Sequence, residues 1–167
     1  VTSGAFYAHL GSKDGAFEAA LSLGLDEVIA AIPEFQLQHG KQWLVAFSDY
    51  YLGQAHRDDL SCGCAMTTLS PEVVRTKPEL HAIYENKMVA IIELMALGLD
   101  GDSHEDCLSR AWTVLGILIG GLTMARAVAS VKTADKIAIS IANAVINIAG
   151  EVKEPLESAP PRFDAHS

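Results

Sequence analysis

Apolar residues recur at helical spacing along almost the whole chain, and no stretch shows the alternation typical of a half-buried strand. In residues 13–32 the apolar positions share one side of a helix with a period of 3.6 residues. The same period returns in residues 41–57, 64–76 and 78–98. The sequence therefore predicts an all-α fold. The predicted core-facing positions of the first of these helices are Ala16, Phe17, Ala20, Leu21, Leu25, Val28, Ile29 and Ile32.

Proline marks two of the expected helix boundaries. Pro33 is expected to close the helix over 13–32, because proline lacks the backbone N–H that a continuing helix needs. Pro71 lies inside the segment 64–76, where we expect a kink or a restart with Ser70 as the helix cap.

The last two expected helices, about 104–130 and 133–149, are apolar on nearly every face. Ser103 and Asp106 are spaced like a capping box at the start of the first helix, and Thr133 is the expected cap of the second. Helices that are apolar all round are buried from more than one side, so these two are expected to pack against the body and against something else. Residues 151–167 contain three prolines and are predicted to be a flexible tail.

Composition excludes several broad classes. Half of the 167 residues are hydrophobic and only 20% are charged, which favours a packed core over disorder. The longest apolar run, about 111–122, is too short for a bilayer span of roughly 20 residues, so no membrane partner is expected. Three cysteines, an odd number, argue against a disulfide scaffold and for the reducing cytoplasm.

Charge is distributed unevenly along the chain. The formal net charge of −9 is unusual for a nucleic-acid binder. However, residues 1–13 contain Lys13 and His9 and no acidic residue. This asymmetry suits a small DNA-facing end on a larger acidic body.

The leader VTSGAFYAHLGSKDGAF resembles the end of the helix-turn-helix in the TetR/AcrR family of transcriptional regulators. Small residues, an aromatic pair, an apolar residue and a Ser-Lys pair follow one another in the family's order. Since the chain begins at Val1, we expect the first two helices of this motif to precede it. The resemblance implies an all-α, TetR-like fold: the C-terminal part of a helix-turn-helix domain followed by a helical ligand-binding and dimerisation bundle.

This resemblance implies a set of DNA-contacting residues in a recognition helix over residues 2–9 and the helix after it. Small and hydroxylated side chains let a helix approach base edges, and Tyr7, His9 and Lys13 can reach phosphates. A phosphate also suits Lys13 because that residue lies at a helix N-terminus. The alternative is a half-buried Tyr7, a surface His9 and a solvated Lys13. The expected DNA-binding residues are Thr2, Ser3, Gly4, Ala5, Tyr7, His9 and Lys13.

The segment 110–130 resembles the penultimate helix of the same family, which pairs with the last helix across a two-fold axis. Its small residues permit close helix approach: Gly116, Gly120, Gly121, Ala125 and Ala129. The resemblance implies a homodimer through helices 104–130 and 133–149, which would bring two reading heads to one operator. An ordinary buried helix in a monomer is the alternative.

Family members sense a small molecule between their middle helices, so the resemblance also implies a ligand site there. Aromatic and methionine side chains suit an apolar, adaptable pocket. The same side chains are equally typical of an ordinary core. The candidate ligand-binding residues are Phe47, Tyr51, Met66, Tyr84, Met88, Met95 and Trp112.

Cys62-Gly63-Cys64 admits a second kind of site. Two thiols one residue apart, with His56 upstream and His81 downstream, could sense oxidants or bind a soft metal. A small-residue packing site is the favoured interpretation, and Cys107 is expected to be a buried small hydrophobe. No cofactor and no metal are expected.

No serine, histidine and acidic residue form a hydrolase motif, so the chain is not expected to be an enzyme. We expect three parts: residues 1–32, the end of the DNA-binding domain with its connecting helix; residues 33–150, the ligand-binding and dimerisation domain; and the tail over 151–167. The expected function is a cytoplasmic regulator, a repressor that binds double-stranded operator DNA as a homodimer and is released by a small-molecule effector. The alternative is a helical small-molecule-binding or thiol-sensing protein without DNA binding.

Overall fold

A computed structural model describes residues 13–58, 64–150 and 152 of the chain. Within these residues the regular structure is helical, and the prediction of an all-α fold is confirmed. An isolated antiparallel bridge joins Leu99 to Val152. The elements are α2 (Lys13–His39), the 3-10 helix η1 (Gly40–Gln42), α3 (Trp43–Leu52), α4 (Gln54–Asp58), α5 (Ala65–Thr68), α6 (Ser70–Val73), α7 (Pro78–Leu97), α8 (His104–Ala127) and α9 (Val131–Ala149).

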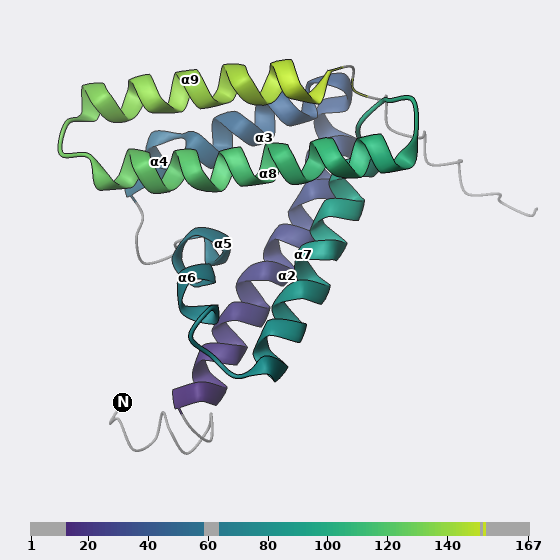
Figure 1. Ribbon diagram of the computed structural model, residues 1–167. Coiled ribbons are helices and arrows are strands. Elements are labelled where there is room, and N and C mark those ends of the chain that lie inside the picture. Colours follow the sequence, from purple (N-terminus) through teal and green to yellow (C-terminus); the bar gives the residue numbers. More distant parts are fainter. Residues whose placement is uncertain (1–12, 59–63, 151, 153–167) are drawn as a thin grey trace, which may run out of the picture.

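The helices form two groups that meet at an angle (Figure 1). Helices α8 and α9 form an antiparallel hairpin, and α3 packs against both of them. Helices α2 and α7 lie side by side and extend away from this layer. The short helices α5 and α6 lie in the angle between the two groups.

Helices α2 and α7 run parallel to each other. Their polar contacts follow the same order along both helices, which only a parallel pair permits. These contacts are Lys77 Nζ to Asp14 at 3.8 Å, Lys87 Nζ to Asp26 at 2.5 Å, and Gln36 Nε2 to the Leu94 carbonyl at 2.8 Å. The chain therefore has to return to the start of α2 before α7 begins, and α4 to α6 make this return.

The prediction that Pro33 closes its helix was wrong, because α2 continues to His39. Proline removes one backbone hydrogen bond from a helix interior, but tertiary contacts can offset that cost. Here Phe35 packs edge-on against Phe47 with ring centroids 5.4 Å apart, and Gln36 bonds to α7. The predicted boundary between residues 32 and 33 thus falls inside a continuous helix.

Two other expected helices are divided. The segment 41–57 consists of η1, α3 and α4, with a break at Gly53, whose backbone is extended. The segment 64–76 restarts near Pro71, as predicted, and forms α5 and α6. Ser70 is not the cap of the restarted helix: it is the first residue of α6, and its hydroxyl pairs with Tyr84.

The ends of the last two helices were predicted in part. The Ser103 hydroxyl accepts a hydrogen bond from the Asp106 N–H, as the capping pattern indicated. Helix α8 ends at Ala127 rather than near 130. Ser130, not Thr133, caps α9, because its hydroxyl accepts from the Thr133 N–H.

One hydrophobic core extends through both groups of helices. The predicted stripe of α2 supplies Leu21, Leu25 and Ile32 as buried residues, with Phe17, Val28 and Ile29 partly buried beside them. Trp43 is fully buried on α3, and its indole N–H donates to the Gly98 carbonyl at 3.0 Å. This bond ties the start of α3 to the end of α7, where the two groups join.

Candidate functional site

Most of the predicted ligand-binding residues lie together in the interior. Phe47, Tyr51, Met66, Met88 and Met95 are buried members of one core cluster, and they come from α3, α5 and α7. Tyr84 is partly buried at its edge. This core extends through both groups of helices, and the side-chain hydrogen bonds of Tyr51 join α3 to α5 within it.

Trp112 does not join this interior group. Its side chain is 46% exposed on α8, on the opposite face from the buried Val114 and Leu118. The position is part of the outer surface of the α8–α9 hairpin, so it is better placed for a contact with another molecule than for lining the core.

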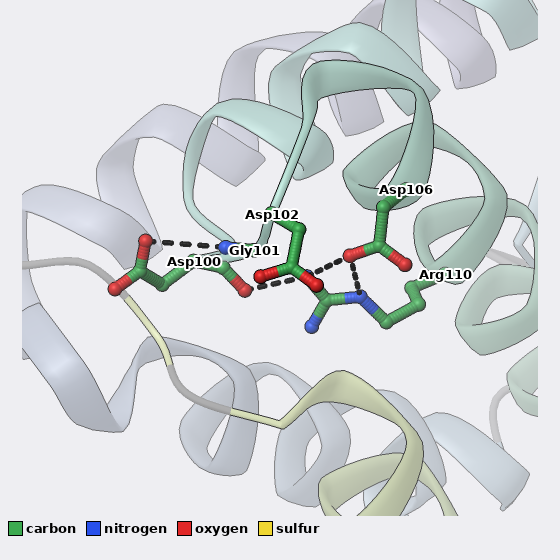
Figure 2. A pocket seen from close by; sticks show the side chains of 5 residues that line it. All are labelled: Asp100, Gly101, Asp102, Asp106 and Arg110. Carbon is green, nitrogen blue, oxygen red and sulfur yellow. Dashed lines mark hydrogen bonds and ion pairs between the residues drawn. The ribbon is translucent and has the colours of Figure 1, made fainter.

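Two hollows of the described surface lie away from these residues. One, of about 400 Å³, is lined by the acidic loop before α8 and by Arg110 (Figure 2). Another, of about 440 Å³, lies between the start of α3 and the end of α9 and is lined by Leu44, Val45 and Ile146 among others. Neither contains a predicted ligand-binding residue. The five buried residues, which we call the interior cluster, are each at most 5% exposed, so the cluster is closed to solvent in this conformation.

Arg110 occupies the first hollow with contacts from within the chain. Its guanidinium pairs with Asp106 at 2.8 Å and donates to the Asp100 carbonyl (Figure 2). It also donates to the Ala149 carbonyl. The side chain thus holds the α7–α8 loop against the end of α9. These contacts give Arg110 a structural role at the join of three segments.

A polar centre lies inside the apolar cluster. The Tyr51 hydroxyl is 3.1 Å from the Cys64 thiol and 3.1 Å from the Thr67 hydroxyl, which links α3 to α5. Burial, followed by the neighbouring Cys64 thiol, raises the pKa of Tyr51 well above its usual value. The phenol therefore stays protonated and acts as a neutral hydrogen-bonding group.

Contacts of His56, Arg57 and Arg126 connect α4 to its neighbours. The His56 ring lies 5.2 Å from the Tyr51 ring, and Arg126 of α8 donates to the His56 carbonyl at 2.6 Å. Arg57 is buried and donates to Asp135 of α9 at 2.6 Å. These contacts fasten α4 to both helices of the α8–α9 hairpin.

Sequence patterns did not single out Arg57, and they gave Ser70 only the role of a helix cap. A charged residue at the end of an expected helix is typical of a solvated position, and a serine before proline is typical of a cap. The burial of Arg57 and the contact of Ser70 with Tyr84 depend on partners that are distant in sequence.

The predicted DNA-binding residues fall almost entirely outside the described part of the chain. Thr2, Ser3, Gly4, Ala5, Tyr7 and His9 all lie there. Lys13 is the first residue of α2 and is exposed. A cation at this end of α2 is placed where a helix N-terminus favours an anion.

The structure describes only some of the residues of the predicted thiol or metal site. Cys62 lies outside the described residues, whereas Cys64 and Cys107 are both buried free thiols. Among the side chains that are described, no group of three or more His, Cys, Asp or Glu residues could hold a metal ion. His81 is exposed on α7. Tyr51 contacts both His56, through its ring, and Cys64, through its hydroxyl.

The outer face of α8 is apolar and low in relief. Trp112, Gly116, Gly120 and Met124 follow one another at four-residue spacing. A methyl group added to Gly116 or Gly120 would meet nothing within 4 Å in the part of the chain that the structure describes, so no contact there requires glycine. Ile139 and Ile146 of α9 are exposed as well.

By length and composition alone, α8 is the one helix in the described ranges that could also cross a membrane. Core helices of water-soluble proteins pass the same test. Part of the apolar surface of α8 is buried within the chain, because Leu115, Leu118 and Leu122 pack into the core.

Comparison with known proteins assigns no family. No protein-family model matches the chain, and no curated protein matches it significantly.

Proposed function

We propose that this chain belongs to a TetR-like transcriptional regulator that acts as a homodimer and responds to a small molecule. The observation that carries the proposal is the outer face of the α8–α9 hairpin, together with the leader that resembles the end of the family's helix-turn-helix. An apolar face for self-association beside a DNA-reading end suits a two-headed operator-binding protein.

Two glycines on α8, Gly116 and Gly120, are the strongest support for the dimer. Glycine in a helix interior costs about 0.5–1 kcal/mol relative to alanine. Both glycines carry that cost, although a methyl group added to either would meet nothing within 4 Å among the described residues. A second hairpin lying close across this face would supply the reason, because small residues allow two helix backbones to approach.

The dimer is tested by adding bulk to this face. Gly120→Leu should weaken self-association, measured by light scattering coupled to size-exclusion chromatography. Ala82→Leu is the matched control, since it adds the same kind of side chain at an exposed position of α7. A Gly120→Leu protein that dimerises as tightly as the control would remove this face from the interface.

Operator binding is tested with the full-length protein and its own upstream DNA. Lys13→Ala should weaken binding and lower the slope of affinity against salt by about one, as expected for loss of one phosphate contact. Lys132→Ala, at an exposed position of α9, is the control of equal charge change. Absence of any operator binding would favour the alternative, a helical small-molecule-binding protein.

The proposed effector site is the interior cluster around Phe47, Tyr51 and Met66. An apolar molecule bound there would touch α3, α5 and α7 together. Binding that prefers one arrangement of these helices shifts the population toward it and so changes operator affinity. This regulation by population shift is the mechanism we propose.

A further inference from the structure

Residues 64–73, which we call the strap, occupy the angle between the α2–α7 pair and the α3–α8–α9 layer (Figure 1). The strap consists of α5 and α6, each of only four residues. Isolated helices shorter than about 12–15 residues are marginal in water. Its position therefore depends on contacts with its neighbours rather than on its own helices.

Side-chain hydroxyl groups make the polar contacts that hold the strap in place. At one end Tyr51 of α3 bonds to Cys64 and Thr67. At the other end the Ser70 hydroxyl pairs with Tyr84 of α7 at 2.8 Å. Each of these contacts can open without breaking a helix of the surrounding framework.

The strap also has one buried face and one exposed face, with no second layer of described residues outside it. Its inner side chains are buried, with Met66 fully enclosed and Val73 nearly so. Its outer side chains, Thr68, Pro71 and Glu72, are exposed. Among the described residues, the strap separates this side of the interior cluster from solvent, whereas the neighbouring α2, α3, α7 and α8 are helices of ten or more residues.

We propose that the strap opens as a unit and is the entrance through which a small molecule reaches the interior cluster. This inference rests on the proposed ligand response, because the cluster is closed and something must move to admit a ligand. The suitable ligand is a mainly apolar molecule that takes the space of Met66. An oxygen on that molecule would replace the Cys64 and Thr67 partners of Tyr51.

The two buried thiols report on opening at two different places. Cys64 lies in the strap and Cys107 lies in α8. In the full-length protein, two variants each keep one of these cysteines and carry serine at every other. A chromogenic aromatic disulfide then labels the remaining thiol, whose sulfur displaces one thiolate and forms a mixed disulfide.

Tyr84→Phe removes the contact with Ser70 and leaves both thiols chemically untouched. We expect about fivefold faster labelling of Cys64, as suits the loss of one hydrogen bond that opposes opening, and no change for Cys107. Tyr50→Phe is the control, because this exposed tyrosine lies outside the strap contacts. The binding rate of Nile red, an apolar fluorescent probe, should rise with Tyr84→Phe in the same proportion.

Three results would overturn the proposal: equal acceleration at both cysteines, which indicates global unfolding; no acceleration at Cys64; or faster Cys64 labelling with an unchanged Nile red rate. None of these measurements involves DNA. Failure of operator binding would therefore bear on the proposed function and leave the behaviour of the strap to be judged separately.

Discussion

The buried guanidinium of Arg57 donates to the half-exposed carboxylate of Asp135 at 2.6 Å and so joins α4 to the second turn of α9. The two ends of this pair have different surroundings, with side chains 8% and 51% exposed. If the pair is broken, water can hydrogen-bond to the half-exposed Asp135 carboxylate, but it reaches the buried Arg57 guanidinium much less easily. The pair is therefore unequal in its effect on stability.

Removing the Asp135 carboxylate alone should lower stability more than removing it together with the Arg57 guanidinium. We expect Asp135→Ala to lower the free energy of unfolding by about 1–3 kcal/mol, because it leaves a buried cation without its carboxylate. Arg57→Met combined with Asp135→Ala should recover part of the loss. Urea unfolding measures both, with Glu72→Ala, which breaks an exposed pair with Arg75, as a control expected below 1 kcal/mol. A double variant no more stable than Asp135→Ala alone would contradict this account.

Tyr51 should make the protein sensitive to alkaline pH. Its pKa is raised in the folded state, mainly by burial. The unfolded chain therefore loses this proton at a lower pH than the folded protein does. Stability from this group is present below the unfolded pKa of about 10 and falls as the pH rises above it.

The comparison of Tyr51→Phe with Tyr50→Phe isolates this effect. Tyr51→Phe should lose about 1–2 kcal/mol at neutral pH, since two hydrogen bonds disappear, and should show a shallower fall above pH 10. Tyr50→Phe should keep the steep fall. Thermal unfolding followed across the alkaline range gives both quantities, and parallel curves for the two variants would count against the role of Tyr51.

Gly24 and Ala65 should show compensating size changes. A methyl group on Gly24 would lie 2.6 Å from the Ala65 Cβ, so α2 and α5 already touch there. Gly24→Ala is expected to lower stability by about 1–3 kcal/mol through overpacking, although alanine favours a helix. Adding Ala65→Gly should restore part of that stability in denaturant unfolding. If the losses of stability caused by Gly24→Ala and Ala65→Gly simply added, the contact between these two positions would not limit the side-chain size there.

Gly121 should tolerate no added methyl group. Its Cβ would lie 2.7 Å from two atoms of Ile141, where α8 and α9 are packed closely. Gly121→Ala should therefore lower the melting temperature by several degrees, as expected for roughly 1–3 kcal/mol of overpacking. The further change Ile141→Ala should relieve the overlap, because it removes both γ carbons that the added methyl group would meet. A Gly121→Ala protein as stable as the parent would show that α9 shifts at little cost.

Helical periodicity predicted the inner faces of the long helices well. Trp43, Leu44, Phe47 and Tyr51 were expected on one face of their helix, and all four are buried. The reason is local: a repeating apolar side can be buried only if it faces a neighbour. The interior position of five of the seven predicted ligand-binding residues follows from this same pattern.

Local signals failed where a tertiary contact opposed them. Pro33 is a strong helix stop in isolation, but Phe35 and Gln36 hold the chain in the helix beyond it. Ser70 is a good cap by sequence, but Tyr84 takes its hydroxyl. In both places the partner comes from a segment more than ten residues away, which no local pattern contains.

By itself, the sequence determined the helical fold, most of the buried positions and the resemblance that suggests a regulator, because each depends on residue order within one segment. Only the tertiary structure decided that α2 and α7 run parallel, that Arg57 is buried against α9 and that Trp112 faces outward. It also decided that a strap of two four-residue helices closes the interior. These features depend on which helices meet, and that is set by packing between segments far apart in the chain.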